Sequence, residues 1–156
     1  MSFLVQQATE ADWPELPLIY EADGYDRAAA GMRERAGWEV EEFLAGKRLL
    51  YFAEANGQPV GTVGLVFGGR DAGHADGATS ANVHRLHVVQ ARRRLGVAMA
   101  LMAAAEGEAR RRGFRRLTIE VEDNNAPARA LYEKLGYVYT GPGHAQNEIA
   151  MAKELR

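Results

Sequence analysis

The segment from Leu86 to Ala105 constrains the fold more than any other part of the chain, because it passes from a strand to a helix through a short turn. Residues 86–89 are apolar enough for a strand, and the Ala/Met/Leu-rich stretch 100–105 predicts a helix. Between them, Gly96 and Ala98 have side chains too small to cover the backbone. The first amides of a helix have no intrahelical acceptor and carry the positive end of its dipole, so this turn predicts an anion site.

Three arginines add positive charge around this predicted anion site, which favours a phosphate-rich ligand: Arg92, Arg93 and Arg94. The spacing of Arg93, Gly96 and Ala98 resembles the pattern Gln/Arg-x-x-Gly-x-Gly/Ala of the GCN5-related N-acetyltransferases, the GNAT superfamily. The resemblance implies that acetyl-CoA is the ligand and that the turn binds its pyrophosphate. The alternative is that the glycine only helps the helix to begin, as such short turns often do.

A second segment, residues 125–137, resembles the second signature of the same superfamily, Asn-x-x-Ala-x-x-Leu-Tyr-x-x-x-Gly-Phe/Tyr. The matching residues are Asn125, Ala128, Leu131, Tyr132, Gly136 and Tyr137. Physical chemistry predicts the same helix without the resemblance. Asn125 caps it, Pro127 fits its first turn, and Gly136 ends it where a left-handed residue is needed. One predicted strand lies between the two motifs, in the order that the superfamily has.

Length and composition predict a single domain over residues 1–156. The chain has 156 residues, of which 47% are hydrophobic, and no linker divides it. No apolar run approaches the roughly 20 residues that span a bilayer, and the start lacks the basic region and apolar core of a signal peptide. A cytoplasmic protein with no membrane partner is therefore expected. The formal net charge of -2 argues against nucleic acid as a partner, and the absence of cysteine excludes disulfides and a thiol nucleophile.

The hydrophobic pattern predicts strands and helices that alternate along the chain. Strands are expected over residues 3–7, 47–55, 58–67, 82–89, 115–122, 137–140 and 147–154, and helices over 26–46, 95–112 and 127–135. Asn56-Gly57 predicts a hairpin, because this dipeptide tolerates positive φ. Asp12 and Glu15 have capping-box spacing and predict a helix that Pro17 bends or breaks. Gly37 predicts a division of the 26–46 helix, and residues 68–81 a long mobile loop.

The predicted elements form an α/β domain with a mixed sheet, and the resemblance implies the same fold in more detail. A GNAT fold has a mixed, mostly antiparallel central sheet with two splayed parallel central strands, flanked by helices. The first of these strands carries a bulge, and the pantetheine arm enters the gap as an extra strand would. By resemblance, the backbone of Leu86, His87 and Val88 binds the pantetheine and the thioester carbonyl. The remaining cofactor-binding residues are then Arg93, Arg94, Leu95, Gly96, Val97, Ala98, Asn125, Ala128 and Tyr132.

The chemistry that the resemblance implies is attack of a neutral amine on the thioester carbonyl, followed by departure of a thiolate that needs a proton. Tyr132 is the candidate general acid, because a phenol with a pKa of about 10 stays protonated at neutral pH. Packing on the sheet is its alternative role. Glu120 is the candidate general base, in a strand similar to a Leu-Glu-Val segment of a GNAT branch that acetylates protein N-terminal amines. An ordinary strand carboxylate is the alternative there.

The proton acceptor has other candidates, namely water and the histidines His84 and His87, which titrate near neutral pH. Strand alternation sends these histidines to opposite faces unless the bulge intervenes. No metal site is expected, because no third ligand accompanies them. The resemblance places the acceptor pocket within residues 20–38 and 68–81, whose acidic and aromatic residues suit a cationic small molecule. A peptide amine stays open as the acceptor.

Two functions of other classes stay open. The first is a non-catalytic acyl-CoA-binding module, which would keep the anion site and lose the acid. The second is a nucleic-acid-binding domain that uses the arginine clusters at residues 92–94 and 110–116. Pairing of two chains through the terminal strands, which would give a homodimer, also stays open. Release of free thiol from acetyl-CoA in the presence of an amine distinguishes the enzyme from both alternatives.

Overall fold

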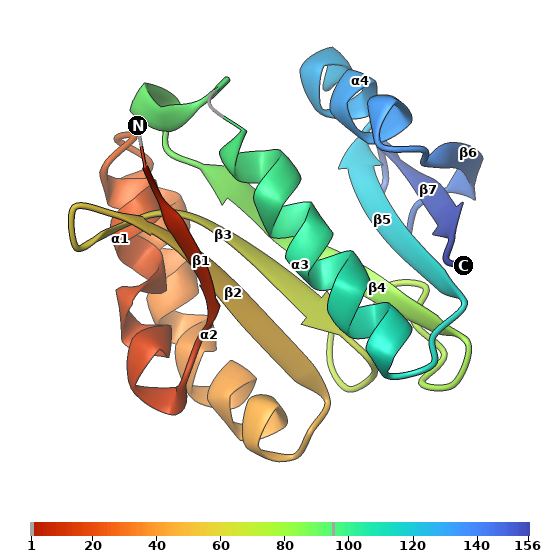
Figure 1. Cartoon of the computed structure of the whole chain (residues 1–156), viewed down its shortest axis with the longest axis horizontal. Helices are drawn as coiled ribbons and strands as arrows, with labels where there is room; N and C mark the ends of the chain where they lie inside the picture. The colour runs from red at the N-terminus through yellow and green to blue at the C-terminus, as the bar shows by residue number, and fades with distance from the viewer. Residues whose placement is uncertain (1, 95) are drawn as a thin grey trace. The chain divides into compact units, whose positions relative to one another are not determined.

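The structure is a computed structural model that describes residues 2–94 and 96–156, and it shows a mixed α/β fold (Figure 1). Its elements are β1 (Leu4–Gln7), η1 (Glu10–Glu15), α1 (Leu16–Glu21), α2 (Asp26–Leu44), β2 (Arg48–Ala55), β3 (Gln58–Val66), β4 (Ser80–Val88), η2 (Gln90–Arg92), α3 (Val97–Arg111), β5 (Arg116–Glu122), α4 (Ala126–Lys134), β6 (Val138–Pro142) and β7 (Glu148–Glu154). The seven strands form a sheet in the order β1-β2-β3-β4-β5-β7-β6. Strand β4 pairs with β5 in parallel, whereas the pairs β1–β2, β5–β7 and β6–β7 are antiparallel. The expected mixed, mostly antiparallel sheet with a parallel central pair is confirmed.

The parallel register between β4 and β5 is short. It runs from Ser80 opposite Arg116 to Val83 opposite Ile119, whereas β4 itself continues to Val88. Beyond the register, Arg85 has a φ of +57°, a left-handed conformation that is uncommon for a residue with a side chain. The register therefore ends within β4, the strand in which the GNAT resemblance implies a bulge.

The chain forms two compact units, of which the first comprises Met1–Leu65 and Arg85–Ala105. Within it, α1 and α2 pack side by side and α2 contacts β2 (Figure 1). Its largest fully buried side chains are Trp13, Leu16, Ile19, Val63, Leu65, Val97, Leu101 and Met102. The predicted hairpin is confirmed, with Asn56 at φ +53° and Gly57 at φ +74° in the turn between β2 and β3. A Cβ at Gly61 would lie 3.1 Å from Leu101 Cδ1, so this glycine lets α3 approach β3 closely.

Two local predictions in the first unit are wrong. Helix α2 runs through Gly37 without a break, because Gly37 is an exposed position whose helix-propensity cost of about 1 kcal/mol a long helix tolerates. A buried ion pair also holds its second half, where Arg48 of β2 lies 3.2 Å from Glu39. The capping box is one turn earlier than predicted: the backbone N–H of Thr9 donates to Asp12 Oδ2 at 2.8 Å, and η1 begins at Glu10.

The second unit comprises Val66–His84 and Glu106–Arg156. Here β7 pairs with β5 along its whole length and with β6 on its other side. The loop before β4 ends at Thr79, and Asp76 accepts hydrogen bonds from the backbone N–H groups of Ala78, Thr79 and Ser80. These bonds hold the pKa of Asp76 well below its usual value. That the two units together form a single domain stays a prediction. The helices of the part that the structure describes are all too short or too polar to cross a membrane.

Removal of the α4 cap is expected to cost the second unit about 1 kcal/mol of stability. Asn125 Oδ1 accepts a hydrogen bond from the Ala128 N–H at 3.2 Å, as the sequence predicts. Asn125→Ala leaves this amide without its acceptor, and urea denaturation measures the loss. The neighbouring Asn124→Ala is the matched control and is expected to change the unfolding free energy by less than about 0.5 kcal/mol. Equal losses in the two variants would contradict the capping role.

Candidate active site

The turn before α3 leaves the first amides of this helix without helical partners. Gly96 has a φ of +84° and its carbonyl accepts the hydrogen bond from Ala100 N at 3.0 Å, which begins the helical pattern. The N–H groups of Val97, Ala98 and Met99 precede that bond, so none of them has an intrahelical acceptor. Leu95, which belongs to the predicted pyrophosphate site, lies outside the described residues.

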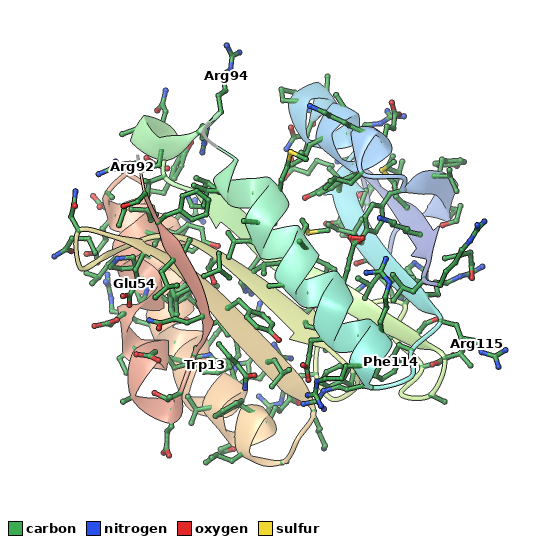
Figure 2. The ribbon with its side chains drawn as sticks, viewed as in Figure 1. Trp13, Glu54, Arg92, Arg94, Phe114 and Arg115 are labelled. Carbon is green, nitrogen blue, oxygen red and sulfur yellow. The ribbon has the colours of Figure 1, made fainter. Side chains whose placement is uncertain are left out.

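The surroundings of this turn fit an anionic group such as a diphosphate. A Cβ built on Gly96 would meet nothing within 4 Å, and Gly96 is exposed, so solvent reaches the backbone. The exposed Arg94 side chain extends outward from the turn (Figure 2). Arg94 itself has a φ of +64°, which turns the chain sharply before the helix. Positive charge and amides without intrahelical acceptors therefore occur together, as anion binding at a helix N-terminus requires.

The Arg93 side chain has a structural role that the sequence does not indicate. Its Nε donates to the Val88 carbonyl at 2.9 Å, and its Nη2 lies 3.6 Å from Asp23 Oδ2. Arg93 thus ties the turn to the end of β4, and it shares the Val88 carbonyl that the resemblance gives to pantetheine. A carbonyl oxygen has two lone pairs, so this hydrogen bond still leaves one of them for a ligand.

Asp23 joins the α1–α2 connection to the end of β4 within the first unit. Its carboxylate, 5% exposed, lies 3.0 Å from His87 Nε2 and accepts from the Gln90 N–H at 2.8 Å. The His87 ring stacks on Tyr20 with centroids 4.7 Å apart. Burial lowers the pKa of His87 below its usual value, although the Asp23 hydrogen bond and charge oppose this. The lowered pKa favours the neutral form of His87, whose Nε2 faces the Asp23 carboxylate.

Tyr132 lies on α4 with only 6% of its surface exposed. Burial raises the pKa of its phenol to about 12, so the hydroxyl stays protonated over the whole physiological range. The ring meets Tyr137 edge to face, with centroids 6.1 Å apart. A buried, permanently protonated hydroxyl meets the first requirement for a general acid.

Glu120 of β5 is held from one side by an asparagine that the sequence does not single out. Asn82 is fully buried, and its Nδ2 donates to Thr118 Oγ1 at 2.6 Å and to Glu120 Oε2 at 3.2 Å. The register places Asn82 directly opposite Thr118. The available sequence signal for this network was a polar residue between two apolar ones, Asn82 between Ala81 and Val83 and Thr118 between Leu117 and Ile119, because buried polar groups need partners.

Two histidines face the other oxygen of Glu120. His74 Nε2 and His144 Nδ1 each lie 3.6 Å from Glu120 Oε1, which accepts no hydrogen bond from the described residues. His74 lies in the segment 68–81, which the resemblance assigns to the acceptor pocket, whereas His144 lies outside every segment of the predicted site. The rival base His84 is directed elsewhere, with its Nδ1 3.8 Å from Asp71 Oδ2.

Comparison with known proteins identifies the family to which this chain belongs. The model of the acetyltransferase (GNAT) family matches residues 5–137. The chain therefore belongs to the GNAT acetyltransferase family, as both sequence motifs indicate. Among curated proteins, none matches the chain.

Several solved structures share the fold. The ribosomal-protein-alanine N-acetyltransferase of Brucella melitensis is 26% identical with a TM-score of 0.74, covering 97% of this chain and 99% of that one. The PaiA N-acetyltransferase of Thermoplasma acidophilum, solved in complex with coenzyme A, is 17% identical with a TM-score of 0.77 and 99% coverage of both chains. The structure of yncA from Salmonella typhimurium, solved with acetyl-CoA, is 22% identical with a TM-score of 0.75, covering 100% of this chain and 95% of that one. Each shows the GNAT-type fold over nearly the whole chain.

Proposed function

We propose that this protein is an N-acetyltransferase that moves the acetyl group of acetyl-CoA to a primary amine by direct attack. The observation that carries the proposal is the open turn before α3, where amides without intrahelical acceptors and an exposed arginine occur in a chain of the acetyltransferase family. The solved neighbours that hold coenzyme A or acetyl-CoA support the choice of cosubstrate.

Acetyl-CoA, when bound, supplies a thioester whose carbonyl carbon accepts the amine and whose thiolate leaves. We assign its pyrophosphate to the amides of residues 96–99 and to the charge of Arg94. The backbone of Leu86, His87 and Val88 is assigned to the pantetheine arm. The second sequence motif assigns Asn125, Ala128 and Tyr132 to cofactor binding. In this assignment the side chain of Arg93 supports the turn through Val88 and Asp23.

Two side chains handle the protons. The amine nitrogen forms the new C–N bond only as a free base, so its proton must pass to an acceptor, and we assign this role to the Glu120 carboxylate. As the C–S bond breaks, its electron pair goes to sulfur, and the Tyr132 hydroxyl donates a proton there. Asn82 holds Glu120 Oε2, which directs the other oxygen away from the hydrogen-bond network.

The acceptor is a small-molecule or peptide amine. Of these acceptors, we favour the N-terminal amine of a peptide. The reason is Glu120, whose strand is similar to the Leu-Glu-Val segment of the family branch that acetylates protein N-terminal amines. The name of the Brucella melitensis neighbour points the same way. A cytoplasmic location and a homodimer stay predictions.

A thiol-release screen tests this function most broadly. Purified protein is mixed with acetyl-CoA and a panel of N-terminal peptide amines, polyamines and aminoglycosides, and free thiol is followed by absorbance. We expect release that depends on both protein and amine. A thermal shift with CoA but no thiol release would indicate an acyl-CoA-binding module. No CoA shift together with salt-dependent retention on DNA would indicate a nucleic-acid-binding domain.

A further inference from the structure

The cluster around Glu120 Oε1 has the composition of a transition-metal site. It consists of His74, Glu120 and His144, all within the second unit, and their nearest ligand atoms all lie within 4.8 Å of one another. Imidazole nitrogens together with one carboxylate oxygen are a ligand set that Zn²⁺ prefers, whereas Ca²⁺ and Mg²⁺ prefer oxygen ligands alone. Three such ligands leave a fourth tetrahedral position for water.

The distances come close to those of a metal site. With Zn–N and Zn–O bonds of about 2.0–2.2 Å, tetrahedral geometry separates neighbouring ligand atoms by about 3.3 Å. Each imidazole nitrogen lies 3.6 Å from Glu120 Oε1. The two rings face each other edge to face, with centroids 4.3 Å apart. The two imidazole nitrogens are therefore about 0.3 Å farther from the carboxylate oxygen than a shared tetrahedral ion requires.

Glycines bring both histidines to the carboxylate. Gly73 precedes His74, and a Cβ there would lie 2.8 Å from the side chain of buried Asn82, which holds Glu120. Gly143 precedes His144, and a Cβ there would lie 2.7 Å from Glu148 Cβ and 3.3 Å from Glu120 Cγ. Gly73 thus lets its loop lie close to Asn82, the hydrogen-bond partner of Glu120, and Gly143 lets a second loop lie close to Glu148 and to the Glu120 side chain.

The Glu120 carboxylate has one oxygen available to bind a metal ion and one held by a hydrogen bond. Its side chain is 11% exposed, and Oε1 is buried without a hydrogen bond from the described residues. Asn82 fixes the other oxygen, as the outer hydrogen bonds of metal ligands usually do. His74 and His144 are more exposed, at 39% and 59% of their side chains, so an ion can reach the cluster from solvent.

We propose that His74 Nε2, Glu120 Oε1 and His144 Nδ1 form a binding site for a divalent transition metal of the zinc class. A bound metal coordinates the Glu120 carboxylate, which the proposed mechanism uses as the base. Metal occupancy therefore slows acetyl transfer. That consequence alone rests on the proposed function. The metal site itself is independent of turnover.

Calorimetric titration of the full chain with Zn²⁺ at neutral pH tests the site. We expect about one ion per chain with micromolar or tighter affinity, and visible tetrahedral absorption bands when Co²⁺ replaces Zn²⁺. His74→Ala and His144→Ala are expected to weaken binding by at least about tenfold each, because each removes one of three ligands. Both side chains are exposed, so metal-free melting temperatures should stay unchanged. His84→Ala, which removes an imidazole outside the cluster, is the control and should bind as the wild type does.

Two results would overturn the proposal: no heat and no cobalt bands with the wild type, or undiminished binding in the double variant His74→Ala/His144→Ala. Metal binding without any acetyl transfer would instead leave the site standing and remove the proposed function. Acetyl transfer that Zn²⁺ does not slow, despite measured binding, would remove Glu120 as the base.

Discussion

Replacement of Tyr132 by phenylalanine is expected to lower kcat by about a hundredfold or more, because the leaving thiolate loses its proton donor. The affinity for CoA should change by less than about twofold, since the variant removes a hydroxyl and keeps the ring in its buried place. Steady-state kinetics with the best amine of the screen, together with calorimetric titration of CoA, separate the two effects. Tyr139→Phe is the matched control, because Tyr139 is an exposed tyrosine of the same unit, and it should leave kcat unchanged.

The pH profile adds a second test of Tyr132. An acid acts in its protonated form, so its contribution persists below its pKa and is lost above it. With the pKa of Tyr132 raised to about 12, the rate should not fall through loss of this proton at pH values near the usual phenol pKa of about 10. An unchanged kcat in Tyr132→Phe would remove Tyr132 from the mechanism.

Introduction of a carboxylate at the start of α3 is expected to weaken CoA binding by about a hundredfold or more. In Ala98→Asp the new charge lies in the first turn, where it repels a diphosphate at short range in a partly buried setting. The same charge interacts favourably with the helix dipole, so the unfolding free energy should stay constant or rise by about 0.5 kcal/mol. Affinity and stability are therefore expected to move independently, which calorimetry and urea denaturation can show on the same protein.

Ala103→Asp provides the matched control on α3. It adds the same charge to the same helix at an exposed position beyond the first turn. CoA affinity should change by less than about twofold, because the amides without intrahelical acceptors belong to the first turn and the effect of the helix dipole falls off beyond it. Wild-type affinity in Ala98→Asp, or equal losses in both variants, would show that the first turn of α3 does not bind the phosphates.

The elements that local chemistry determines were predictable from the sequence. Asn125 caps α4, Gly136 ends it at a φ of +98°, and Asn56-Gly57 forms its hairpin turn, because each residue type is adapted to one backbone conformation. The prediction fails where two neighbouring residue pairs can both form a capping box. Thr9 and Asp12 form the capping box instead of Asp12 and Glu15.

The contacts that build the site depend on residues far apart in the chain. From its sequence neighbourhood, Asp23 would be expected to face solvent, yet its carboxylate contacts His87 and Arg93. No local sequence pattern indicates partners more than 60 residues away. His74 and His144 likewise have no periodicity or motif that relates them to Glu120. Among these contacts, the Asn82–Thr118 pair had a readable signal, because each of these polar residues lies between two apolar ones in its strand.

Calorimetric titration of the purified protein with CoA tests most directly whether the turn before α3 binds a phosphate-rich cosubstrate. About one CoA per chain should bind with a Kd in the micromolar range, and saturation at about 100 times Kd should stabilise the fold by about 2.7 kcal/mol. Absence of both heat and thermal shift at millimolar CoA would contradict the account.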